Sequence, residues 1–256
     1  MKQAIPNQNN EKITVVVKTP KLPQGLVFVA HGLGGHKEHA FIETIAKAFY
    51  ENNYTIVTWD ARKTKGESDG ELIDATLSNH YEDLETVVEW ASQQKWYQEP
   101  FIMCGHSLGA ACGVLFTDKY PQKIKALAPF SLFTSGERFE ADFNQEEFDI
   151  WKKNKVREWV SPSRPDYVKH LKWDFMEDAY KYDLFDSTKN ITMPVLMMVG
   201  GSDEVTPPDL QHQFLEAIPT EDKKLCIVEG SNHSFAGKEY LEKAKVFIEE
   251  WLDVLK

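Results

Sequence analysis

The chain has 256 residues, of which 42% are hydrophobic and 27% are charged. This length and composition suit a globular protein with one well-buried core, and they leave little room for two full domains. The formal net charge of −11 argues against nucleic acid and anionic lipid as partners, because binding to phosphates needs clustered Lys and Arg side chains.

Predicted strands and helices alternate along most of the chain. In chain order, apolar runs and helical apolar spacing predict strands at 13–18 and 26–30, a helix at 41–50, a strand at 54–59, a helix at 81–93, a strand at 101–104, a helix at 108–119, strands at 124–130, 194–199 and 225–228, and a helix at 240–255. This alternation predicts a doubly wound, mostly parallel sheet. Reactive groups in such sheets collect at the carboxyl ends of the strands.

The stretch 132–190 breaks this alternation. It is rich in aromatic residues and contains no evident parallel strand, so we expect several helices there. We therefore predict one α/β domain over residues 1–256, with a helical cap inserted at 132–190. The aromatic side chains of this stretch could pack the cap against the core or face a ligand, and the sequence is compatible with both uses.

Three features of the sequence bear on where the protein works. Cys104, Cys112 and Cys226 lie in apolar or helical stretches without forming a close pair, which indicates free buried thiols in a reducing cytoplasm and argues against a zinc site. No apolar run follows the charge near the N-terminus, so no signal peptide is expected. No window approaches ~18 consecutive apolar residues, so we expect no membrane-spanning segment and a cytoplasmic location.

The pentapeptide Gly105-His106-Ser107-Leu108-Gly109 fits the pattern G-x-S-x-G. It follows an apolar strand and precedes a helix that starts with small residues, which is the strand–turn–helix context that the pattern needs. The tight turn forces the serine backbone into a strained conformation, and the flanking glycines avoid clashes there. Ser107 is therefore the predicted nucleophile, with a helix N-terminus behind it that would stabilise a developing oxyanion.

A serine nucleophile needs a general base and an acid that orients the base. Asp203 and His233 each follow a predicted strand, and the chain order Ser, Asp, His is the order expected for this arrangement. Glu204 and Asp209 are rival acids, but Asp203 lies closest to the strand end. The histidines outside the motifs are expected at the surface or in the cap, namely His36, His39, His80, His170 and His212.

Two backbone N–H groups are expected to form an oxyanion hole. The N–H of Leu108, at the start of the helix, is the first. The second should come from the Gly-rich loop at 31–35, where Leu33 is our choice and Gly34 the alternative. His31, Gly32 and His106 are expected to support these residues rather than to react.

Together these motifs resemble those of the α/β-hydrolase superfamily over essentially the whole chain. His31-Gly32 matches the oxyanion motif of that family, residues 105–109 match its nucleophile elbow, and Gly201-Ser202-Asp203 and Asn232-His233 match its acid and base loops. The segment 31–38, the loop 60–70 and the cap resemble the monoacylglycerol lipase and feruloyl (cinnamoyl) esterase group of small serine esterases. The resemblance implies an α/β-hydrolase fold.

The residues and the resemblance imply an enzyme that transfers an acyl group to water through an acyl-enzyme, without a metal or an organic cofactor. We expect a carboxylic ester hydrolase whose substrate is a small apolar or aromatic acyl ester. A thioesterase, a lysophospholipase or monoacylglycerol lipase, or a peptidase could use the same triad. A non-catalytic binding protein on the same fold is a further alternative. The sequence carries no indication of an oligomeric state.

Overall fold

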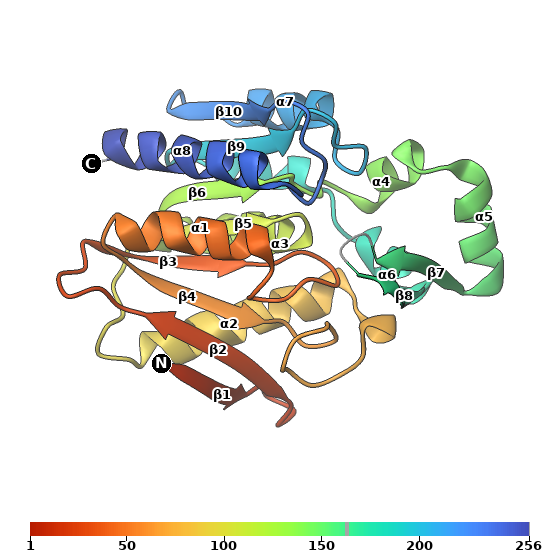
Figure 1. Ribbon diagram of the computed structural model, residues 1–256, viewed down its shortest axis with the longest axis horizontal. Helices are drawn as coiled ribbons and strands as arrows, with labels where there is room; N and C mark the ends of the chain where they lie inside the picture. The colour runs from red at the N-terminus through yellow and green to blue at the C-terminus, as the bar shows by residue number, and fades with distance from the viewer. Residues whose placement is uncertain (162–163, 256) are drawn as a thin grey trace.

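The computed structural model describes residues 1–161 and 164–255. Its centre is an eight-stranded sheet with the order β1-β2-β4-β3-β5-β6-β9-β10 (Figure 1). Strand β2 is antiparallel to β1 and β4, and the remaining pairs are parallel. The strands are β1 (Lys2–Pro6), β2 (Lys12–Lys18), β3 (Gly25–Ala30), β4 (Tyr54–Asp60), β5 (Phe101–His106), β6 (Ile124–Phe130), β9 (Val195–Gly200) and β10 (Lys223–Val228). The predicted doubly wound, mostly parallel sheet is confirmed.

Helices cover the sheet on both faces and divide the core into two layers. The first layer contains side chains of α1 and α8 against one face, and the second contains side chains of α2, α3 and α7 against the other. Figure 1 shows α1 and α8 in front of the strands. These helices are α1 (Ala40–Glu51), α2 (Leu77–Ser92), α3 (Leu108–Lys119), α7 (Pro208–Ala217) and α8 (Lys238–Val254), and short 3₁₀ helices lie at η1 (Leu72–Asp74) and η2 (Pro121–Lys123).

The insertion, residues 132–190 between β6 and β9, is only partly helical. It contains α4 (Gly136–Asp142), α5 (Gln145–Asn154), α6 (Asp174–Ala179) and η3 (Leu184–Asn190), but also an antiparallel hairpin of β7 (Val156–Ser161) and β8 (Arg164–Lys172). The sequence analysis did not predict this hairpin. Its physical basis is the β-branched and aromatic content of Val156, Trp159, Val160 and Val168, together with Lys155, which ends α5 in a left-handed conformation at φ 61°.

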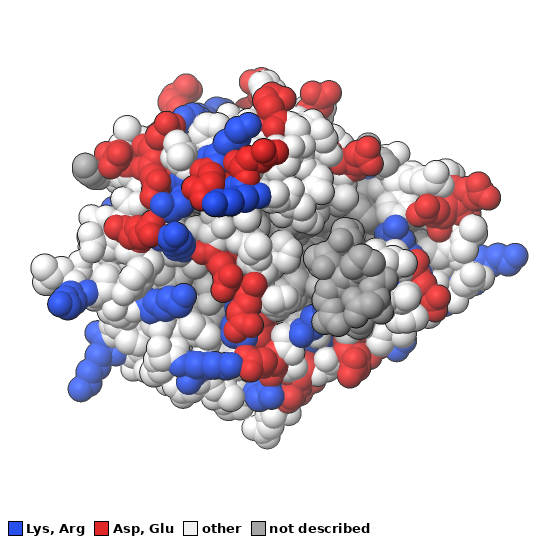
Figure 2. Space-filling view, in the orientation of Figure 1, with Lys and Arg blue, Asp and Glu red and all other residues white. Residues whose placement is uncertain are grey.

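Two further elements were not predicted. Strand β1 pairs along β2 at the edge of the sheet and buries only Ile5, so its sequence shows no apolar run. Helix α7 begins directly after Pro207, with Pro208 in its first turn, where a missing N–H costs nothing. On the face shown in Figure 2, acidic and basic side chains are interspersed over the described residues.

The register of the parallel strands aligns the ends from which the predicted site residues emerge. Ala30 pairs with Gly105, His106 pairs with Phe130, and Phe130 pairs in turn with Met198. The loops after β3, β5, β6, β9 and β10 therefore meet along one edge of the sheet, the edge formed by the carboxyl ends of the parallel strands. This edge is where reactive groups are expected in a parallel sheet.

Candidate active site

Ser107 lies at the junction of β5 and α3 with φ 54° and ψ −118°. A non-glycine residue seldom adopts a positive φ, so the turn holds this backbone in a strained conformation. The close approach of neighbouring backbone explains the flanking glycines. A Cβ on Gly105 would lie 2.6 Å from the carbonyl carbon of Gly109, and a Cβ on Gly109 would lie 2.4 Å from the carbonyl oxygen of His31. Neither position can hold a larger residue without a backbone shift.

The structure brings Ser107, His233 and Asp203 into one hydrogen-bonded chain. The Nε2 atom of His233 lies 3.0 Å from the Ser107 Oγ atom. The Nδ1 atom of His233 lies 2.9 Å from Oδ2 and 3.0 Å from Oδ1 of Asp203. A carboxylate accepts only, so Nδ1 is the donor and Nε2 is left to accept the serine hydroxyl proton. The rival acids Glu204 and Asp209 are exposed.

Asp203 is buried at 3% exposure, yet its carboxylate is heavily hydrogen-bonded. The N–H groups of Val205 and Thr206 donate to Oδ1 at 3.0 and 2.9 Å, and the hydroxyls of Ser131 and Thr206 donate to Oδ2 at 2.8 and 2.9 Å. Burial alone would raise the pKa of Asp203, but hydrogen bonds from His233, Thr206 and Ser131 outweigh it and lower the pKa to about 2. The carboxylate therefore stays ionised at neutral pH.

Ser131 and Thr206 were not identified from the sequence. A signal for Thr206 is present, because an aspartate that accepts backbone N–H bonds two and three residues later forms a common local turn. Ser131 reaches Asp203 across 72 positions of sequence. Its only sequence signal is its place directly after β6, at the same edge of the sheet as Ser107.

His106 supports His233 from behind. Its Nε2 atom lies 2.8 Å from the carbonyl oxygen of His233, and the two rings are 4.9 Å apart. Burial lowers the pKa of His106 to about 3, so the ring is neutral and donates this hydrogen bond through an Nε2–H group. Phe235, with φ 51°, stacks on Phe41 at 4.0 Å between ring centroids and fixes the same loop.

The loop after β3 lies directly against the nucleophile. A Cβ on Gly32 would lie 3.0 Å from the Cβ of Ser107. The N–H groups of Leu33 and Leu108 have no hydrogen-bond acceptor among the described residues, and the same holds for Gly34. Gly34 has φ 63°, which is costly for residues with a side chain. Free N–H donors therefore flank Ser107 from two sides, with Leu33 and Gly34 both still available as the second donor.

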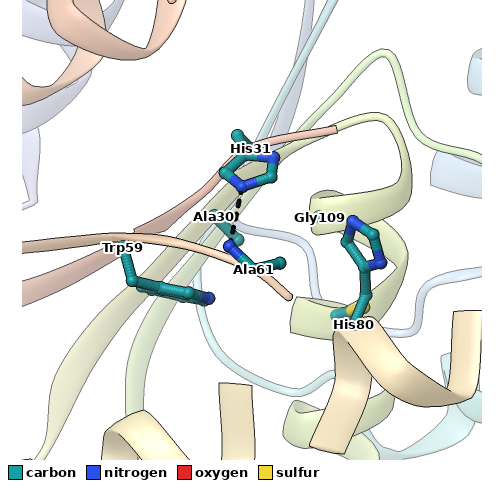
Figure 3. A pocket seen from close by; sticks show the side chains of 7 residues that line it. Ala30, His31, Trp59, Ala61, His80 and Gly109 are labelled. Atoms are coloured by element: carbon teal, nitrogen blue, oxygen red, sulfur yellow. Dashed lines mark hydrogen bonds between the residues drawn. The ribbon is translucent and has the colours of Figure 1, made fainter. Parts of the chain in front are cut away.

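His31 and the loop after β4 brace this backbone. The Nδ1–H group of His31 donates to the Gly32 carbonyl at 2.8 Å, and Nε2 accepts the N–H of Ala61 at 2.9 Å (Figure 3). The carboxylate of buried Asp60 accepts two hydrogen bonds from Lys37, one from its backbone N–H and one from its Nζ, each at 2.8 Å. These contacts hold the 31–37 segment at both ends, in keeping with the supporting role expected of His31 and Gly32.

His80 was expected at the surface or in the cap, and this prediction is wrong. It is 3% exposed on α2, and its ring centroid lies 5.9 Å from that of His31. With His31, Trp59 and Gly109 it lines a cavity of about 10 Å³ behind the loop after β3 (Figure 3). Its Nε2 atom has no hydrogen-bond partner among the described residues, and burial lowers its pKa to about 3.

The described residues hold neither a metal-binding cluster nor a membrane-crossing helix. Within residues 1–161 and 164–255, no three His, Cys, Asp or Glu side chains are grouped so that they could hold a metal ion. Among the helices of the same ranges, none combines the length and apolar character that a membrane crossing requires. The three cysteines are buried and free.

The chain is similar to proteins of known sequence and structure. A family model described as "Serine aminopeptidase, S33" matches residues 21–239. The chain is 24% identical over 282 residues to "Putative esterase/lipase 2" of Mycoplasma genitalium, covering 98% of this chain and 97% of that protein. It is 22% identical over 247 residues to mouse "Palmitoyl-protein thioesterase ABHD10, mitochondrial", covering 93% and 77%. The structure of Est1E from Butyrivibrio proteoclasticus with ferulic acid superposes with a TM-score of 0.81 at 23% identity, covering 98% of this chain and 97% of Est1E.

Proposed function

Because this chain belongs to the serine aminopeptidase S33 family of α/β hydrolases, we propose that it hydrolyses carboxylic esters, with Ser107 as nucleophile, His233 as general base and Asp203 as the orienting acid. The observation that carries the proposal is the hydrogen-bonded chain from Ser107 Oγ through His233 to Asp203, at 3.0 and 2.9 Å. These distances suit proton transfer from a serine hydroxyl to an imidazole.

The reaction follows from these contacts. His233 Nε2 takes the Ser107 proton as Oγ attacks the ester carbonyl carbon, and the carbonyl π electrons move onto its oxygen. The N–H groups of Leu108 and Leu33 donate to that oxyanion. When the intermediate collapses, the bond to the alcohol breaks, and His233 gives its proton to the leaving oxygen. Water then attacks the acyl-enzyme by the same route, which releases the acid and restores Ser107.

We infer a substrate with a small apolar or aromatic acyl group. The aromatic-rich insertion, which Figure 1 shows beside the end of the sheet toward which β3 and β5 point, supports this inference. The relatives named as an esterase/lipase and a palmitoyl-protein thioesterase are compatible with acyl transfer. Thioester and peptide hydrolysis are the alternatives on the same triad, and a cytoplasmic location stays a prediction.

Hydrolysis of 4-nitrophenyl butyrate tests the proposal. We expect turnover by the wild-type protein and a loss on the order of 10⁶ in kcat for Ser107→Ala, as is typical when a triad nucleophile is removed. Ser92→Ala is the matched control, because Ser92 ends α2 and its hydroxyl donates to the Glu89 carbonyl within that helix. Butyryl thioester and amide substrates, run beside the ester, test the alternatives. Equal activity in wild type and Ser107→Ala would overturn the proposed nucleophile.

A further inference from the structure

The side chain of Lys169 reaches from the β7–β8 hairpin to the loop that carries the proposed oxyanion donor. Its Nζ atom lies 3.1 Å from the position that a Cβ on Gly34 would occupy, and Leu72 of η1 lies 3.2 Å from the same point. Figure 1 shows the hairpin beside the edge of the sheet toward which β3 and β5 point. The ammonium group therefore lies beside Gly34, the residue that follows Leu33.

The hairpin is attached firmly enough to hold this lysine in place. Lys172, three residues further along β8, forms an ion pair with Asp74 of η1. Trp151 of α5 donates its indole N–H to the Leu171 carbonyl at 3.1 Å. Trp159 pairs directly with Lys169 in the antiparallel register, and its ring centroid lies 5.8 Å from Nζ. Lys169 thus has an aromatic neighbour and a fixed backbone.

Lys169 has no acidic partner among the described residues. The other basic side chains described on the hairpin do have one: Arg157 lies 3.5 Å from Glu147, His170 lies 3.1 Å from Glu158, and Lys172 pairs with Asp74. Burial lowers the pKa of Lys169, and the nearby positive charge of Lys65 lowers it further. A half-buried ammonium group for which the described residues offer no carboxylate is unfavourable unless an anion is bound there.

We propose that Lys169 binds an anionic group of the substrate, so that the ester which this protein cleaves carries a negative charge near the scissile bond. This inference rests on the proposed function and narrows its substrate class. Leu72 and Trp159 provide apolar surface beside the ammonium group. The substrate is then apolar along its body and negatively charged at one end. The charge can belong to the acyl part or to the alcohol part, and the test below distinguishes the two.

Two matched pairs of esters test the proposal. In the first, 4-nitrophenyl valerate is compared with the 4-nitrophenyl half-ester of glutarate, in which a carboxylate replaces the terminal methyl group of the acyl chain. In the second, 4-methylphenyl butyrate is compared with 4-carboxyphenyl butyrate, which places the carboxylate on the alcohol. The measured quantity is the ratio of kcat/KM for the charged ester to kcat/KM for the neutral ester.

We expect Lys169→Met to lower this ratio about 10- to 100-fold for at least one pair, as the loss of a charge-assisted contact predicts. Lys169→Arg should keep most of the preference. Lys172→Met removes one positive charge from the same strand and should leave the ratio unchanged, because Lys172 is paired with Asp74. In the wild-type protein, added salt should lower the ratio for the same pair.

The two proposals fail in different ways. If the neutral esters are hydrolysed, and Lys169→Met leaves both ratios within about twofold of wild type, the anion site is overturned while the esterase proposal stands. If the wild-type protein hydrolyses none of the four esters, the proposed function itself is overturned. If Lys172→Met lowers the ratio as much as Lys169→Met does, the effect belongs to net charge and the specific site is overturned.

Discussion

The hydroxyl groups of Ser131 and Thr206 offer a sharp test of how Asp203 acts. Both donate to the same carboxylate oxygen, at 2.8 and 2.9 Å, and that oxygen also faces His233 Nδ1. Thr206→Val removes one donor with little change in shape, and Ser131→Ala removes the other. Each substitution leaves the Ser107–His233–Asp203 chain itself intact. The Thr206 hydroxyl also lies 3.3 Å from His233 Nδ1, so Ser131→Ala is the variant that reports on Asp203 alone.

The expected magnitude follows from two estimates. A hydrogen bond to a charged group contributes about 1.5–3 kcal/mol. The fall of the Asp203 pKa from 3.8 to about 2 corresponds to about 2 kcal/mol of net stabilisation of the ionised form, after the opposing effect of burial. We therefore expect each single variant to lose about 10-fold in kcat/KM. The double variant should lose less than the product of the two, because both donors serve one oxygen.

The same variants make a prediction about pH. Asp203 has a lowered pKa in the folded state, so its contribution to stability is present above pH 3.8 and is lost as the pH falls toward 2. Removing either hydroxyl raises that pKa, and the difference in unfolding free energy between pH 7 and pH 3 should shrink. Urea unfolding at both pH values measures it. Thr44→Val is the control, since the Thr44 hydroxyl donates to the Ala40 carbonyl of its own helix.

Full activity and unchanged acid sensitivity in the Ser131→Ala/Thr206→Val double variant would refute this reasoning. The remaining hydrogen bonds of Asp203 would then be sufficient to orient His233, and the two hydroxyls would have only a packing role.

Three further predictions concern stability. Gly109→Ala should lower the unfolding free energy by about 3 kcal/mol, since its Cβ would lie 2.4 Å from the His31 carbonyl oxygen. Gly113→Ala on the same helix should cost less, because its nearest neighbour is the flexible Met103 side chain. Urea unfolding of both variants compares the two costs. Between about pH 6.5 and 3, buried His80 stays neutral in the folded protein, whereas the same side chain takes up a proton in the unfolded chain. His80→Phe should therefore reduce the slope of unfolding free energy against pH in this range, by up to about 1.4 kcal/mol per pH unit. An unchanged slope would contradict the burial of a neutral His80 ring. Ser107→Gly and Ser107→Ala should both be inactive, but the unfolding free energy of the glycine variant should be higher by about 1 kcal/mol, because glycine adopts the positive φ without strain. Thermal unfolding should therefore give the glycine variant the higher Tm. Equal Tm values would argue against strain at the turn.

Most strands of the sheet were predictable from sequence because each one is marked by residues that are neighbours in the chain. Continuous apolar runs mark the buried strands, and 124–130 and the helix at 108–119 have the bounds that the structure shows. Strand β1 was missed because an edge strand that buries one residue has no such run. The hairpin of the insertion was missed because its strands are polar at many positions and are surrounded by helical segments, so only tertiary packing separates strand from helix there.

In the candidate site, too, some residues were predictable from the sequence and others were not. Ser107, Asp203 and His233 follow strands, so their order and spacing were visible, and the structure brings them together. The partners that position them come from distant segments. Ser131 reaches Asp203 and Lys169 reaches Gly34 only after the chain has folded. Neither residue type carries a local signature, so no pattern in the sequence alone indicates these contacts.

Covalent labelling with a fluorophosphonate, followed by intact-mass and peptide mass spectrometry, tests the central claim most directly. Such a reagent reacts with a serine only where a base and oxyanion donors activate it. We predict one adduct per chain, located on the peptide that contains Ser107, absent from Ser107→Ala and strongly slowed in His233→Ala. An unlabelled wild-type protein, or an adduct at another residue, would contradict the assignment of Ser107 as an activated nucleophile.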